Sequence, residues 1–131
     1  MTVVDGDHGR LRRGSEIAAV LRSRQQRAGR LAVAHATLRP SGGADSPEGA
    51  ARARVAVVAS RRVGGAVQRN RAKRLLREAV RPLPLRADVD LVLVARPGCA
   101  SARFEGVRAE VEALARGLHV LAVDATVEAD V

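Results

Sequence analysis

The sequence Ala66-Val-Gln-Arg-Asn-Arg-Ala-Lys-Arg-Leu-Leu-Arg-Glu-Ala-Val-Arg81 decides the fold of this chain. Its apolar residues follow the i, i+3, i+4, i+7 spacing of one side of a helix. They are Ala72, Leu75, Leu76, Ala79 and Val80. Its cations recur at every fourth position, which places them in a strip along the same helix. They are Arg69, Lys73, Arg77 and Arg81, with Asn70 and Arg74 beside them. The spacing predicts a helix over 66–81 with one apolar side and one cationic side.

The cationic strip favours a polyanion as its partner. Glu78 is the only acid in this stretch. Like charges four residues apart on a helix repel one another unless an anion lies across them. A solvated helix surface is the ordinary alternative for a run of charges, and it fits runs of mixed sign better than this one.

Charge is also unevenly distributed along the chain as a whole. Residues 52–87 contain eleven basic residues and one acid, whereas residues 88–131 contain four arginines and eight acids. A basic excess confined to one part of a chain indicates a binding surface. Phe104 is the only aromatic residue besides histidine, so contacts with a nucleic acid must depend on phosphates and arginine planes rather than on stacked aromatic rings.

A length of 131 residues with 47% hydrophobic content predicts one domain. We expect it over residues 10–120, with flexible tails at 1–9 and 121–131. No apolar run has the length of a signal peptide or a membrane span, and one cysteine permits no intramolecular disulfide, so we expect a soluble cytoplasmic protein.

Apolar periodicity and turn residues predict six elements. A helix capped by Ser15 should end near residues 24–29, strands should occupy 30–39 and 53–60, and a loop rich in glycine and proline should join them over 40–51. After the basic helix we expect a buried strand at 90–96 and a helix at 101–117 with Phe104 facing inward. The order α-β-β-α-β-α predicts an α/β (α+β) sandwich, with helices on a small mixed sheet.

Residues that could form a catalytic or metal site in the protein are few. Asp88 and Asp90 are spaced as paired carboxylates, but at the start of a strand such residues more commonly form turns. His35 on a strand is more often a structural histidine than a base, and Cys99 has no histidine near it in sequence. We therefore predict no catalytic residue and no metal site in the chain itself.

Ser60-Arg61-Arg62-Val63-Gly64-Gly65, followed by Arg69-Asn70-Arg71-Ala72-Lys73-Arg74 in the basic helix, resembles the protein subunit of bacterial ribonuclease P. The segments 10–13 and 90–96 fit the same family, and the resemblance covers roughly residues 10–118. It implies an α/β sandwich with a left-handed βαβ crossover, against the usual right-handed rule.

The resemblance also implies the function. The chain would be a monomeric subunit bound one-to-one to a catalytic RNA, which carries the active site and most of the Mg²⁺ and removes the 5′ leader of precursor tRNA. The residues implied to bind the RNA are Arg61, Arg62, Arg69, Asn70, Arg71, Lys73, Arg74 and Arg77.

The resemblance further implies a cleft for the single-stranded leader, between the sheet and the first helix. Its residues would be Arg12, Arg13, Ile17, Leu21 and His35. Where the family commonly has two Phe and a Tyr, this chain has Ile17, Leu21 and His35, and these cannot stack on bases as a ring does. Two alternatives stay open, namely a structural RNA-binding protein of the small ribosomal type, and a protein-only nuclease, for which no cluster of acids is evident.

Overall fold

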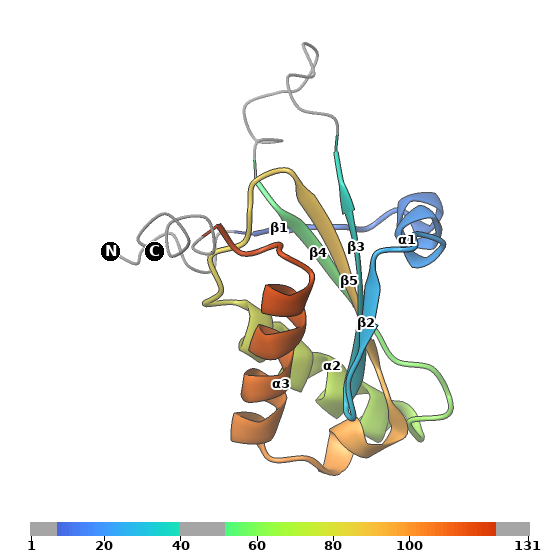
Figure 1. Ribbon diagram of the computed structural model, residues 1–131. Helices are drawn as coiled ribbons and strands as arrows, with labels where there is room; N and C mark the ends of the chain where they lie inside the picture. The colour runs from blue at the N-terminus through green and yellow to red at the C-terminus, as the bar shows by residue number, and fades with distance from the viewer. Residues whose placement is uncertain (1–7, 40–51, 123–131) are drawn as a thin grey trace.

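A computed structural model describes residues 8–39 and 52–122 of the chain (Figure 1). The elements in chain order are β1 (Gly9–Arg10), α1 (Gly14–Leu21), β2 (Gln26–Ala28), β3 (Ala32–Leu38), β4 (Arg54–Val58), α2 (Ala66–Val80), β5 (Val89–Ala95), the 3-10 helix η3 (Pro97–Ser101) and α3 (Phe104–Gly117). This order contains the predicted α-β-β-α-β-α sequence, with two short strands added.

The strands form one mixed sheet in the order β1-β4-β5-β3-β2. Strand β5 lies at its centre, parallel to β4 and antiparallel to β3. Because β4 and β5 are parallel neighbours joined through α2, the predicted βαβ unit is confirmed. The left-handed sense of its crossover stays a prediction.

Helices cover both faces of the sheet, with α1 on one face and α2 and α3 on the other (Figure 1). Successive residues of a strand point to opposite faces. In β5, Leu91 and Leu93 accordingly join the larger core with α2 and α3, while Val92 packs with α1 residues such as Val20. The continuous apolar run of β5 is thus buried on both sides, as predicted.

Several predicted boundaries and orientations were wrong. Helix α1 ends at Leu21, and its N-cap is Arg13, with no capping side-chain hydrogen bond from Ser15. Ser101, the expected first residue of the last helix, is the last residue of η3, and α3 begins three residues later at Phe104. Phe104 is 38% exposed rather than inward. Strands β1 and β2 were not predicted, because their residues show no apolar alternation.

The predicted tails fall partly inside the fold. Gly9 belongs to β1, and Leu121 is buried and bridges to Leu85. The other residues of the predicted tails, 1–7 and 123–131, lie outside the described residues. So does the predicted loop at 40–51. Within the described residues, no helix combines the length and the apolar character needed to cross a bilayer.

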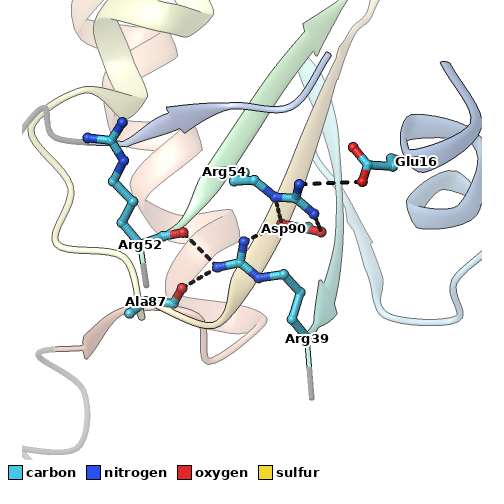
Figure 2. A network of polar contacts seen from close by, with 6 residues as sticks. All are labelled: Glu16, Arg39, Arg52, Arg54, Ala87 and Asp90. Atoms are coloured by element: carbon cyan, nitrogen blue, oxygen red, sulfur yellow. Dashed lines mark hydrogen bonds and ion pairs between the residues drawn. The ribbon is translucent and has the colours of Figure 1, made fainter. Parts of the chain in front are cut away.

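A network of charged side chains ties α1 to the sheet (Figure 2). Asp90 is 5% exposed and accepts two hydrogen bonds from Arg54, from Nε at 2.9 Å and from Nη2 at 2.7 Å. Arg39 lies 3.4 Å from the same carboxylate, and Arg54 also approaches Glu16 of α1 at 3.4 Å. The prediction of Asp90 as a turn residue was wrong, since it is an ion-paired residue of β5. Asp88 pairs with Arg86 instead, so the two carboxylates do not act as a pair.

Candidate nucleic-acid interface

Helix α2 has a buried apolar side and an open cationic side. Ala72, Leu76, Ala79 and Val80 are all buried in the larger core. In the described part of the chain, no acid forms an ion pair with any of the predicted RNA-binding cations. These are Arg61, Arg62, Arg69, Arg71, Lys73, Arg74 and Arg77. The packed apolar side fixes the orientation of the helix, so the cations are presented in a fixed register.

The turn before α2 brings two further cations to the same end of the molecule. Gly64 has φ of 143°, a conformation that L side chains rarely adopt, and Gln68 Oε1 accepts a hydrogen bond from the Gly65 N–H at 3.0 Å. Val63 is buried and anchors the turn. Arg61 and Arg62 are both exposed in this turn, next to the N-terminus of α2.

Arg71 differs from the other predicted RNA-binding residues. Its Nε donates a 2.6 Å hydrogen bond to the carbonyl oxygen of Ala100 in η3. Because residues two positions apart on a helix point in nearly opposite directions, Arg71 leaves the strip that contains Lys73 and Arg69. Arg71 therefore fixes η3 to α2 through its Nε. This role does not depend on the contacts of its other guanidinium nitrogens.

The predicted leader residues lie on the opposite face of the sheet, with α1. Ile17 and Leu21 are half-buried and pack against Ala56 and Val92. His35 of β3 is directly opposite Val92 in the register of β3 and β5, so its side chain projects to the same face. Arg12 and Arg13 are exposed where the chain enters α1. The structure thus brings the five predicted residues to one side of the sheet.

His35 supplies no charge to this face at neutral pH. Burial lowers the pKa of its imidazole below the usual value of 6.5. Its Nδ1 is buried and has no hydrogen-bond partner among the described residues. A neutral imidazole with a free ring nitrogen offers hydrogen bonding rather than ion pairing to a bound group.

Two cations of this region were not among the predicted site residues. Arg10 and Arg81 line a hollow at the edge of the sheet together with Arg77. Arg10 lies in β1, and Arg81 follows the last residue of α2. Positions 10 and 81 are far apart in the sequence, and no periodicity relates them. They come together only in the folded chain, through the pairing of β1 with β4.

The described residues contain no group of three or more His, Cys, Asp or Glu that could hold a metal ion. Cys99 is fully buried, and burial, with a smaller contribution from the charge of Glu110, raises the pKa of its thiol. A buried thiol of raised pKa is a poor nucleophile. The exposed cations of α2 suit binding of an anion.

Comparison with known proteins identifies the family to which the chain belongs. The family model described as "Ribonuclease P" matches residues 7–119. Curated relatives include the ribonuclease P protein component of Ruegeria pomeroyi, 39% identical over 113 residues that cover 83% of this chain and 85% of the relative. The protein component of Shouchella clausii is 35% identical over 115 residues, covering 86% of this chain and 88% of the relative.

Solved structures share the fold. The RNase P protein of Staphylococcus aureus superposes with a TM-score of 0.69 at 19% identity, covering 86% of this chain and 96% of that one. The RNase P protein from Thermotoga maritima gives 0.65 at 21% identity, covering 83% and 97%. The family match over most of the chain, joined to the sequence identity of the curated relatives, shows that this chain belongs to the ribonuclease P protein family.

Proposed function

We propose that the chain binds the catalytic RNA of ribonuclease P through α2 and receives the 5′ leader of precursor tRNA on the α1 side of the sheet. The observation that carries the proposal is the strip of α2, in which Arg69, Lys73, Arg74 and Arg77 have no acid partner among the described residues although their helix is packed on the core. Unneutralised cations at i,i+4 spacing are stabilised when phosphates lie across them.

The chain's contribution to cleavage is electrostatic. Catalytic RNA and precursor tRNA are both polyanions and repel each other, so cations placed between them lower the free energy of the productive complex. Arg74 and Arg77 of α2 would face one RNA, while Arg12 and Arg13 at the start of α1 would face the other. Because α1 and α2 lie on opposite faces of the sheet, the two RNAs would meet the protein on different sides.

The leader would contact aliphatic rather than aromatic side chains. Ile17 and Leu21 offer half-buried apolar surface beside His35. Such surface shields bases from water but gives little of the oriented stacking, worth about 1–3 kcal/mol per base, that an aromatic ring provides. Leader binding would therefore depend more on phosphate contacts than in relatives with rings at these positions.

The reaction is hydrolysis of one phosphodiester, which leaves a 5′ phosphate on the mature tRNA. Since the described residues offer no carboxylate cluster for Mg²⁺, we assign the ions mainly to the RNA. Mg²⁺ would supply an activated water and stabilise charge on the phosphate. The protein's own residues would bind and orient the two RNAs as a monomer, one copy per catalytic RNA, in the cytoplasm.

Cleavage of precursor tRNA by the catalytic RNA at low Mg²⁺, with and without this chain, tests the proposal. We expect the chain to accelerate cleavage strongly at low Mg²⁺ and weakly at high Mg²⁺, where free ions screen the two RNAs. A chain that binds RNA but leaves the cleavage rate unchanged at every Mg²⁺ concentration would instead be a structural RNA-binding protein of the ribosomal type.

A further inference from the structure

A hollow of about 330 Å³ lies at the outer edge of the sheet between α1 and α2. Its floor is aliphatic and includes Leu11, Val55, Val57 and Val80. The hollow reaches from Ile17 of α1 to the last turn of α2, so it joins the two surfaces described above.

The hollow exposes an unpaired strand edge. Strand β1 pairs with β4 only as far as Val55, whose carbonyl oxygen accepts a hydrogen bond from the Leu11 N–H at 2.9 Å. Alternate residues of a strand turn their backbone groups to the same edge. Val57 therefore turns its N–H and C=O into the hollow, where β1 has already ended and the chain has left for α1. A donor and an acceptor side by side match the hydrogen-bonding edge of a nucleobase.

Three cations surround this edge. Arg10 is opposite Val55 in the register of β1 and β4, so its side chain projects to the side of the sheet that α2 covers. Arg77 and Arg81 reach the hollow from α2. Arg81 lies 3.4 Å from Glu78, but both side chains are largely exposed, so this pair is weak and a phosphate could replace it. Among the described residues, no acid lines the hollow itself.

We infer that this hollow binds one unpaired nucleotide of the catalytic RNA. Its base would lie on the aliphatic floor and bond to the backbone of Val57, while its phosphates would contact Arg10, Arg77 and Arg81. Arg77 lies in α2 and Arg81 directly follows it, and both belong to the strip, which faces the catalytic RNA in the proposed function. The inference rests on that function. The nucleotide would thus be an unpaired residue next to the phosphates bound by the strip.

Nuclear magnetic resonance of the full chain tests the pocket directly. The probes are the four nucleoside 5′-monophosphates and, separately, inorganic phosphate. We expect at least one mononucleotide to shift the backbone amide signal of Val57 saturably, and inorganic phosphate to leave that signal in place. Absence of any Val57 shift with all four mononucleotides would overturn the inference.

A pair of charge variants tests the source of the nucleotide. Arg10→Gln with Arg81→Gln removes two cations of the hollow, and Arg24→Gln with Arg103→Gln removes two exposed cations elsewhere. We expect the first variant to make the salt dependence of catalytic-RNA binding shallower by about 1.4–1.8 in log-log slope, taking about 0.7–0.9 per phosphate contact, and the control to change it little. Equal effects of the two variants would overturn the inference.

Three further outcomes separate this inference from the proposed function. If the hollow variant bound the catalytic RNA normally but lost preference for precursor over mature tRNA, the nucleotide would belong to the leader and our assignment would be wrong. If the unmodified chain accelerated cleavage while the hollow variant behaved as the control, only the hollow would be refuted. Loss of acceleration by the unmodified chain would refute the proposed function itself.

Discussion

Replacing Arg69, Lys73 and Arg77 of α2 with glutamine should weaken RNA binding without weakening the fold. The three cations are consecutive members of the strip, and none forms an ion pair with an acid among the described residues. Their substitution removes repulsion at three i,i+4 pairs, since Arg77 also repels Arg81. Each pair costs about 0.2–0.5 kcal/mol, and the partly buried stems of Arg69 and Lys73 lose some packing in exchange. We expect the free energy of unfolding to change by less than about 1 kcal/mol.

The salt dependence of binding gives the magnitude of the loss. If five to eight cations contact phosphates, the log-log slope of affinity against salt should be about −4 to −7 for the unmodified chain. Three lost contacts should make it shallower by about 2–3. Across a fourfold rise in salt, this difference amounts to roughly 20- to 40-fold in relative affinity. Filter binding of the catalytic RNA at several salt concentrations measures the slope, and urea unfolding measures stability.

A variant with the same loss of charge provides the control. Arg24, Arg30 and Arg103 are exposed and lie outside α2, and their replacement by glutamine should leave the slope within about one unit of the unmodified value. The reasoning would be refuted by an unmodified slope shallower than about −2, or by control and strip variants that bind alike. A strip variant that loses stability in proportion to binding would show that the cations are structural.

Three other perturbations have definite expected results. Leu21→Phe with His35→Tyr should raise the ratio of holoenzyme affinities for precursor and mature tRNA, because aromatic rings add stacking worth about 1–3 kcal/mol per base. An unchanged ratio in a folded variant would place the leader elsewhere. Asp90→Asn should lower the free energy of unfolding by about 2–3 kcal/mol in urea titrations, because Arg54 loses a buried partner. Asp88→Asn, in a pair that is partly exposed, should cost less than about 1 kcal/mol, and equal costs would contradict the role of the network. Cys99 should resist a thiol reagent until urea unfolds the chain, since burial raises its pKa, and rapid native labelling would disprove that burial.

The central elements could be predicted because their signals are local. Helix α2 was expected to begin at Ala66 and does, and it ends one residue before Arg81 because its apolar spacing is long and Pro82 stops it. Strands β1 and β2 gave no such signal. Gly9–Arg10 and Gln26–Ala28 are strands only because β4 and β3 offer them hydrogen-bonding edges, a property of the assembled sheet.

The candidate site also contains residues that the sequence could place and residues that it could not. The strip of α2 follows from spacing alone, and the placement of Ile17, Leu21 and His35 on one face followed once the family resemblance fixed their elements. Asp90 was misjudged because its partner Arg54 is 36 residues away in sequence. Arg10 was missed for the same reason. Arg81 was counted in the cationic strip but was not expected to share a hollow with Arg10, since only the pairing of β1 with β4 brings them together.

The most direct test of the account is to map the RNA that contacts α2. Native Cys99 is buried, so Arg74→Cys introduces a single reactive thiol, to which an RNA-cleaving iron chelate can be tethered. Ala113→Cys, an exposed position on α3, is the control. We predict cuts at discrete positions of the catalytic RNA from residue 74 in the holoenzyme, and none there from residue 113. The assignment of α2 to the catalytic RNA would be contradicted if residue 74 gave no cuts in that RNA, or if its cuts fell in the precursor leader instead.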